Sequence, residues 1–337
     1  MLNFTPQSPS MPKILIIRFS SIGDIVLTTP VVRCIKEQLG NAEIHYLTKE
    51  QYRPLLIANP YIHKIFTIRN DIKDVIPLLK RENSDFIVDL HHSLRSMITR
   101  AALLRPSGTF PKKNIQKWIL VNLKVDRMPE VHVVDRYFRA VRKLKISNDG
   151  QGLDYFIPGA DMVHLDTLPL THREGYLAFI IGARHQTKIL PAEKIIRLCR
   201  KMGQPVVLLG GPEDQVRGDA IALEAGALVH NACGRMSINQ SASLVARANL
   251  VITHDTGMMH IAAAFRKRII SVWGNTVPAF GMYPYYPEGY SHLSSILEVK
   301  DLDCRPCSKL GFASCPRKHF RCMNEINEEA IVKLISP

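Results

Sequence analysis

Two short loops of this chain carry the residue types that sugar-transfer and phosphate chemistry need, and each loop follows an apolar strand. The first is Arg18–Asp24, which reads Arg-Phe-Ser-Ser-Ile-Gly-Asp after the strand expected at 13–17, of which residues 14–17 are apolar. The second is His254–Gly257, which reads His-Asp-Thr-Gly between the apolar residues 250–253 and a run of small residues. A strand-to-helix turn of this kind presents free N–H groups and the positive end of a helix, which suits a diphosphate. Its carboxylates, Asp24 and Asp255, either cap the following helix or act on a ligand, and each segment alone leaves both alternatives open.

The elements around these loops alternate between strand and helix, which predicts open parallel α/β sheets. In the first half we expect strands at 13–17, 43–47, 64–68 and 86–90, with helices up to about residue 39, near 52–59 and near 72–81. In the second half we expect strands at 176–182, 205–210, 250–253 and 268–273, with helices at 192–202, 215–225, 237–248 and 260–265. Two Rossmann-like domains follow from this pattern, and ligands of such sheets bind beyond the carboxyl ends of the strands. We therefore expect the two domains to face each other across a cleft.

Length and composition bound the organisation of the chain. At 337 residues it exceeds one compact core of ordinary size, so two domains are expected. The predicted division is a disordered leader at 1–12, an N-terminal domain at 13–160, a C-terminal domain at 161–320, and a helix at 321–337 that crosses back to the first domain. The leader lacks the features of a secretory signal and no apolar run approaches the ~20 residues of a membrane span, so a cytoplasmic protein with reduced cysteines is expected.

The positive charge of the chain is concentrated in one region. The formal net charge is +14, and residues 91–145 hold thirteen Lys and Arg against three Asp and Glu. Such a region attracts nucleic acid, an acidic membrane or a phosphorylated substrate, or it only keeps the protein soluble. Nucleic acid is disfavoured because no nucleic-acid motif and few aromatic residues accompany the basic residues.

Taken together and in order, the motifs of this chain resemble those of glycosyltransferase family 9, whose best-known members are lipopolysaccharide heptosyltransferases. The resemblance runs from Lys13 to Ile335. Besides the two loops it includes His132–Tyr137, Leu208–Asp214, Gly234–Ser237, the segment through Ala264 and a cysteine-bearing tail. It implies a GT-B architecture, with the acceptor on the N-terminal domain and the nucleotide-sugar on the C-terminal domain.

The resemblance also assigns roles to residues. It makes Asp24 the base that takes the proton of the attacking acceptor hydroxyl in an inverting transfer, and it makes Lys188 the cation that neutralises the leaving diphosphate. It implies no cofactor and no catalytic metal, with ADP-heptose as the expected donor. The donor-binding residues that it implies are Thr187, Lys188, Glu213, Gly234, Met236, Asp255, Thr256, Gly257 and His260. Asp214 is an alternative to Glu213 as the ribose ligand, while His260 and Met236 are explained equally by packing.

The expected acceptor is the anionic inner core of lipopolysaccharide, which the basic region fits independently. The predicted acceptor-binding residues are Arg18, Ser20, Ser21, Gly23, Arg95, Arg100, Lys112, Lys113 and Lys117. We expect a monomer, peripheral on the inner face of the cytoplasmic membrane, that contacts an anionic lipid surface and binds no nucleic acid. The alternatives are a transferase or epimerase of this fold with another substrate, and a non-catalytic protein that binds a nucleotide-sugar or lipopolysaccharide.

The tail contains Cys304, Cys307, Cys315 and Cys322, of which the first two form a Cys-x-x-Cys pair. This spacing raises a structural zinc site. The second pair is spaced irregularly for common zinc modules, so packed or free thiols are the favoured interpretation.

Overall fold

The computed structural model describes residues 11–335 and divides the chain into two compact units. The first unit runs to Lys112 and resumes for Val134–Asp149, and the second consists of Lys113–Val133 and the chain from Gly150 onward. Each unit contains one parallel sheet. The predicted leader falls almost wholly on residues 1–10, which lie outside the described residues.

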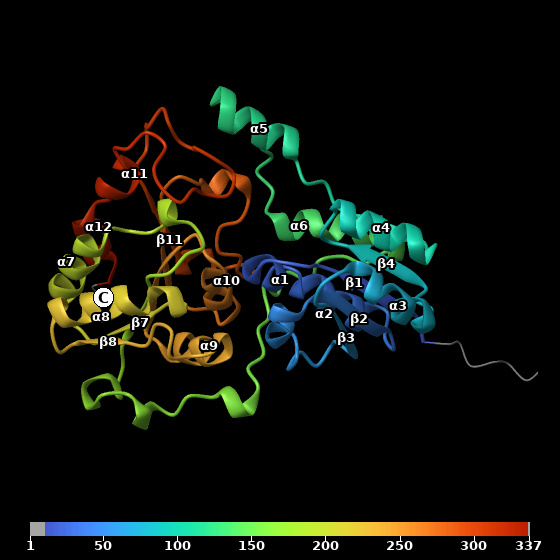
Figure 1. The fold of residues 1–337 in the computed structure, drawn as a ribbon, viewed down its shortest axis with the longest axis horizontal. Helices are drawn as coiled ribbons and strands as arrows, with labels where there is room; N and C mark the ends of the chain where they lie inside the picture. The colour runs from blue at the N-terminus through green and yellow to red at the C-terminus, as the bar shows by residue number, and fades with distance from the viewer. Residues whose placement is uncertain (1–10, 336–337) are drawn as a thin grey trace, which may run out of the picture. The chain divides into compact units, whose positions relative to one another are not determined.

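The sheet of the first unit has five strands in the order β3-β2-β1-β4-β5 (Figure 1). Its central strand β1 reads Lys-Ile-Leu-Ile-Ile and is buried on both faces, as expected of a strand paired on both sides in a parallel sheet. The strands are β1 (Lys13–Ile17), β2 (Glu43–Lys49), β3 (Lys64–Ile68), β4 (Phe86–Asp89) and β5 (Ser107–Thr109). The helices are α1 (Ile22–Val26), α2 (Thr29–Gln38), α3 (Ile76–Glu82), α4 (Leu94–Leu103) and α6 (Val133–Tyr137), the last beginning at the junction between the units.

Three predicted helices of this unit differ in the structure, and a proline explains each difference. The helix expected up to residue 39 is two helices, because Pro30 begins α2 afresh. The segment near 52–59 is a 3₁₀ helix, Glu50–Leu55, that contains Pro54. The segment 72–81 is a 3₁₀ turn, Ile72–Asp74, followed by α3 with Pro77 in its first turn.

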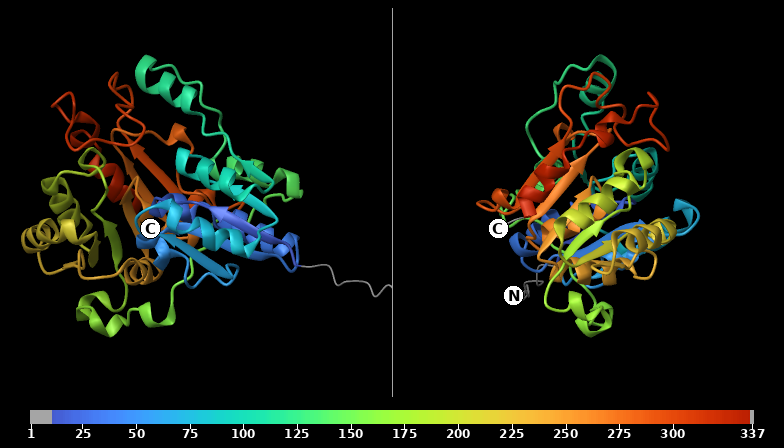
Figure 2. Two further views of the ribbon diagram at one scale, coloured as in Figure 1. Left: turned by 45° about the vertical axis from the view of Figure 1, so that its right-hand side comes forward. Right: turned by 90° about the vertical axis from the view of Figure 1, so that its left-hand side faces the viewer.

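The sheet of the second unit has six parallel strands in the order β11-β10-β9-β6-β7-β8. They are β6 (Leu177–Ile180), β7 (Val206–Leu209), β8 (Val229–Asn231), β9 (Leu250–His254), β10 (Ile269–Trp273) and β11 (Ser294–Glu298). The helices are α5 (Asn114–Leu123), α7 (Ala192–Met202), α8 (Gln215–Ala225), α9 (Ile238–Arg247), α10 (Gly257–Ala264), α11 (Arg321–Asn324) and α12 (Glu328–Ile335). Helices α7, α8 and α12 gather together, and α9 packs against α10 (Figures 1 and 2).

Both sheets have the strand order of a Rossmann-like fold, so each unit has one point at which the order reverses. In the first unit this switch point lies between β1 and β4, and in the second it lies between β6 and β9. Ligands of open α/β sheets bind beyond the carboxyl ends of the strands at such a point. The topology therefore selects the loops after β1, β4, β6 and β9.

The boundaries of the units differ from the predicted ones at two places. The second unit already begins at Gly150, whose carbonyl accepts a hydrogen bond from the Glu288 N–H at 3.3 Å. The excursion Lys113–Val133 also belongs to the second unit, where the Val133 N–H donates to the Gly281 carbonyl at 2.8 Å.

The C-terminal helix belongs to the second unit, and its predicted contact with the first unit stays a prediction. Helix α12 packs on α7, and Glu328 forms ion pairs with Arg197 at 2.7 Å and with Lys194 at 3.4 Å. Ile331 and Ile335 of α12 are buried in the core of this unit and explain the docking, while the ion pairs hold the start of the helix. Within residues 11–335, no helix combines the length and apolar character that crossing a bilayer requires.

Candidate active site

The switch point of the first unit brings together the loops after β1 and β4. Asp24 lies in α1, directly after the first of these loops, and its carboxylate has three hydrogen-bonding or ionic contacts. Arg18 Nη2 lies 2.5 Å from Asp24 Oδ1, while the N–H and the hydroxyl of Ser21 donate to Oδ2 at 3.0 and 2.8 Å. The Ser21 contacts are those of a helix N-terminus, so Asp24 does take part in capping α1. The ion pair with Arg18 is an additional feature that capping does not require.

The environment of Asp24 keeps its carboxylate ionised. Burial alone raises the pKa of Asp24, but the charge of Arg18 and the hydrogen bonds from Ser21 outweigh burial and bring the pKa below its ordinary value. Arg18 is itself buried, and it is held by the carbonyls of Ser20 and Leu90 and by the ring of Tyr137 5.8 Å away. The pair is therefore a fixed feature of the unit.

His91 joins this cluster from the loop after β4, and the sequence reasoning missed it. Its ring lies 4.8 Å from that of Phe19 between centroids. Burial, followed by the charges of Arg18 and Lys112, lowers the pKa of His91 to about 4, so the imidazole is neutral at physiological pH. Within the described residues its buried Nδ1 has no hydrogen-bond partner. The rule that drew attention to the loop after residues 13–17 applies equally to the end of the predicted strand 86–90 and would have found it.

The remaining predicted acceptor residues are not all in one place. Ser20 and Gly23 belong to the Asp24 loop, and Arg95 is exposed on α4. Arg100 turns instead toward the buried Asp89, with 3.2 Å from Nε to Oδ2, so it pairs with a charge of the core. Lys112 is the last residue of the first stretch of the first unit, and its charge contributes to the low pKa of His91.

Lys113 and Lys117 require a correction, because the structure assigns them to the second unit and not to the predicted acceptor domain. Lys117 Nζ lies 5.9 Å from the centre of the Phe280 ring, and this contact helps to hold the excursion on the second unit.

The switch point of the second unit brings together Lys188, after β6, and Asp255, after β9. Lys188 Nζ lies 2.5 Å from Asp255 Oδ2, and both side chains are mostly buried. The sequence left two alternatives for Asp255, a helix cap or a residue that binds the donor. The helix cap is excluded, because α10 begins at Gly257 with Thr256 as its N-cap and no side chain caps it. The free N-terminus of α10 therefore adjoins the Lys188–Asp255 pair.

Two residues that the sequence reasoning missed position this pair. The Thr276 hydroxyl donates to Asp255 Oδ2 at 2.8 Å from the loop after β10. His254 Nε2 accepts a hydrogen bond from the Leu190 N–H at 3.0 Å, which ties the Lys188 loop to the end of β9. Burial lowers the pKa of His254 to about 3, so this nitrogen remains an acceptor. Thr276 lies just after the predicted strand 268–273, and this position could have identified it from the sequence as a candidate site residue.

Thr187, a predicted donor-binding residue, makes a structural contact with a distant segment of its unit. Its side chain is buried, its hydroxyl donates to the Phe312 carbonyl at 3.1 Å, and its Oγ1 accepts from the Phe312 N–H at 2.8 Å. A hydroxyl held in this way fastens the 312 segment to the Lys188 loop. Its predicted contact with the donor stays a prediction.

The structure distinguishes the roles of Glu213 and Asp214, which the sequence left as alternatives for the ribose ligand. Asp214 is buried, and its carboxylate contacts Arg217 at 2.8 Å and the Gly211 N–H at 3.0 Å. Burial raises the pKa of Asp214, and Arg217 counteracts this effect. Asp214 therefore stabilises the turn, and Glu213, which is exposed, is the carboxylate available to a ligand.

The other predicted donor residues surround the same edge of the sheet. Gly234 has φ +70° and donates its N–H to the Gly210 carbonyl at 3.2 Å, a left-handed position that favours glycine. Met236 is half-buried in the following turn. His260 is buried on α10, in keeping with the packing alternative.

The zinc site raised for the cysteine tail stays a prediction, because the charges of Cys304 and Cys315 act on both Cys307 and Cys322. Cys304, Cys307, Cys315 and Cys322 are free thiols, and burial raises the pKa of Cys322 to about 12. Across residues 11–335 the one set of three close His, Cys or acidic ligand groups is Glu43, His45 and Glu82. Lys13 and Lys64 pair with the two glutamates, so these charges are already balanced.

Two Rossmann-like units with charged loops at their switch points define a GT-B glycosyltransferase. Residues 74–311 match the model of glycosyltransferase family 9 (heptosyltransferase), and the chain belongs to this family. A lipopolysaccharide heptosyltransferase 1 of Campylobacter coli is 23% identical, over 96% of this chain and 98% of its own.

Solved structures agree with this assignment. A family 9 glycosyltransferase of Veillonella parvula has a TM-score of 0.76 at 20% identity, with 98% of this chain and 99% of that chain covered. The ADP-heptose lipopolysaccharide heptosyltransferase II of E. coli has a TM-score of 0.72 at 18% identity, with 96% and 97% covered. These similarities confirm the predicted GT-B fold, and the family match confirms the enzyme class.

Proposed function

We propose that this enzyme transfers heptose from ADP-heptose to the anionic inner core of lipopolysaccharide, with inversion at the anomeric carbon. The observation that carries the proposal is that each unit places the charge that this reaction needs at its own switch point. The first unit places an ionised carboxylate, Asp24, and the second places the Lys188 ammonium beside the free start of α10. The names of the relatives support the donor and the acceptor.

In the proposed mechanism, the second unit binds the donor. The diphosphate draws Lys188 from Asp255 and also receives the N–H groups of Thr256 and Gly257 at the start of α10. Asp255, still held by Thr276, then accepts hydrogen bonds from sugar hydroxyls. The ammonium and the helix start stabilise the negative charge that develops on the leaving ADP. Glu213 binds the ribose, and the turn of Gly234 and Met236 contacts the adenine.

The first unit binds and activates the acceptor. Asp24 takes the proton of the acceptor hydroxyl as that oxygen bonds to the anomeric carbon and the bond from this carbon to ADP breaks. Arg18 and Ser21 hold the carboxylate, and the neutral His91 adds no competing positive charge to this cluster. Arg95 and Lys112 attract the acidic groups of the acceptor. We propose a monomer that works on the cytoplasmic face of an anionic membrane, with no metal in the chemical step.

Calorimetry with ADP, UDP, GDP and CMP tests the donor. The proposal expects ADP to bind at least about tenfold more tightly than the others, a difference of ~1.4 kcal/mol. Tighter binding of another nucleotide would indicate a transferase of the same fold with a different donor. Binding of ADP without any consumption of ADP-heptose in the presence of acceptor would indicate a non-catalytic binding protein.

A further inference from the structure

Helices α4 and α5 expose the apolar faces that a helix of a globular protein normally buries. On α5, Ile115, Trp118 and Leu123 are 73%, 58% and 58% exposed. Their spacing of three, five and eight places them on one side of the helix. Single exposed apolar residues are ordinary, but a whole stripe on a surface helix marks an interaction site.

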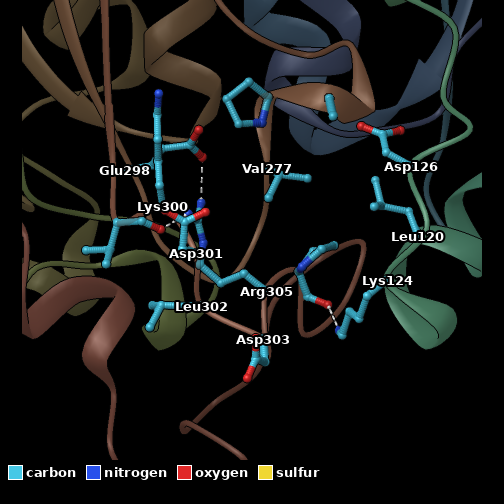
Figure 3. A pocket seen from close by; sticks show the side chains of 14 residues that line it. Leu120, Lys124, Asp126, Val277, Glu298, Lys300, Asp301, Leu302, Asp303 and Arg305 are labelled. Carbon is cyan, nitrogen blue, oxygen red and sulfur yellow. Dashed lines mark hydrogen bonds and ion pairs between the residues drawn. The ribbon is translucent and has the colours of Figure 1, made fainter.

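The opposite side of α5 faces the protein. Leu120 is buried, and Lys124 Nζ donates to the Pro306 carbonyl at 2.7 Å. Both residues line a pocket of about 490 Å³, where Figure 3 shows Lys124 pointing toward the 305–306 turn. Figures 1 and 2 show α5 at the end of an extended loop, away from the six-stranded sheet of its own unit. The orientation of the helix is thus fixed with its apolar stripe outward.

Helix α4, in the first unit, also exposes apolar side chains and buries polar ones. Leu94, Met97 and the adjoining Leu104 are 73%, 49% and 87% exposed, whereas Ser96 and Thr99 are fully buried. The hydroxyl of Thr99 is satisfied within the helix by the Arg95 carbonyl at 2.9 Å. Small polar residues therefore face the core while leucine and methionine face outward.

The charge around both stripes identifies what covers them. From residue 91 to residue 125 the chain has seven Lys and Arg and no Asp or Glu. A protein interface of mixed charge does not require such a bias, whereas an anionic lipid surface attracts it, and tryptophan is enriched at the water–lipid boundary. We propose that the outward faces of α4 and α5 insert into the interface of an anionic bilayer, with the flanking lysines and arginines on the headgroups.

This inference rests on the proposed function, which supplies a lipid-linked acceptor, and it adds the elements that reach the membrane. Its test needs neither donor nor acceptor, so the two can fail separately. Loss of transfer with intact vesicle binding would count against the proposed function alone.

The chain has two tryptophans, Trp118 and the buried Trp273, so a Trp273→Phe variant reports on α5 alone. Full-length protein is mixed with vesicles of phosphatidylcholine or of equal parts phosphatidylcholine and phosphatidylglycerol. We expect a blue shift of Trp118 emission and quenching by brominated acyl chains with the anionic vesicles only, and weaker binding as salt is raised.

Double variants then identify the contact surface. Ile115→Ser with Leu123→Ser, and Leu94→Ser with Leu104→Ser, should each weaken co-sedimentation with anionic vesicles about tenfold, or ~1.4 kcal/mol. The matched control is Val216→Ser with Leu223→Ser, which removes two equally exposed apolar residues of α8 and should change nothing. Thermal melting confirms that each variant is folded.

Absence of binding to anionic vesicles would overturn the proposal, as would equal losses in the control. A third contrary result is a change in self-association, measured by sedimentation velocity, with vesicle binding unaltered. That result would make the stripes a protein contact.

Discussion

Replacing Arg18 by methionine should change both the acidity of Asp24 and the stability of the first unit. Methionine is a long, unbranched side chain like arginine but carries no charge, so the variant removes the charge that lies 2.5 Å from Asp24 Oδ1. In the variant, burial still raises the pKa of Asp24, and only the hydrogen bonds from Ser21 lower it. A neighbouring opposite charge lowers a carboxyl pKa by ~1–3 units, so we expect a rise of that order.

The stability effect has a definite pH dependence. Because the pKa of Asp24 in the folded protein is below its ordinary value, the ion pair stabilises the fold above that ordinary value. This contribution disappears as the pH falls through the folded pKa. Breaking a buried pair costs ~3–5 kcal/mol. The difference in unfolding free energy between wild type and Arg18→Met should therefore be largest at neutral pH and narrow in acid.

The assay is the pH profile of kcat/KM for ADP-heptose transfer, with urea unfolding at each pH. The acidic limb should move ~1–3 units upward in Arg18→Met and much less in Arg18→Lys, which retains the charge. Arg69→Met is the control, because Arg69 is exposed and lies 3.5 Å from Glu50. An unmoved acidic limb in a folded Arg18→Met variant would refute the coupling between Arg18 and Asp24.

Two further predictions concern the second unit. Lys188→Ala should lower kcat by ~10²–10³ because it removes charge stabilisation of the leaving group, and Lys188→Arg should recover part of the rate; an unchanged kcat would exclude this role. Glu213→Gln should raise the calorimetric Kd for ADP about tenfold and leave the melting temperature unchanged. Asp214→Asn should mainly lower the melting temperature, since Asp214 is buried with Arg217. The reverse pattern would mean that Asp214 binds the ribose and Glu213 stabilises the turn.

The strands and their loops were predictable because their signals are local. Residues 13–17 form a strand with the predicted bounds, since the apolar run 14–17 has few other places in a parallel sheet. Residues 64–68 also form a strand with the predicted bounds, at the edge of the sheet, where the buried Phe66 and Ile68 alternate with less buried residues. The same holds for α7, whose apolar residues recur with a helical period. By contrast, β5 reads Ser-Gly-Thr and carries no apolar pattern at all.

The partners within the site could not be predicted, because they depend on long-range packing. Asp255 meets Lys188 across 67 residues and Thr276 across 21, and either contact removes it from the cap position that its local sequence favours. Thr187 likewise meets Phe312 across 125 residues. A local motif indicates which loop is functional, and tertiary structure decides which of its polar groups are already used.

A comparison of transfer by the wild type and by Asp24→Asn tests whether the enzyme transfers heptose with Asp24 as the base. Both proteins are incubated with ADP-heptose and a lipopolysaccharide acceptor that lacks heptose, and the product is followed by mass spectrometry while ADP affinity is measured by calorimetry. We expect the wild type to add heptose only when acceptor is present. We expect Asp24→Asn to react ~10²–10⁴-fold more slowly with nearly unchanged ADP affinity. Undiminished turnover by Asp24→Asn would exclude Asp24 as the base, and no heptose added by the wild type would exclude heptose transfer.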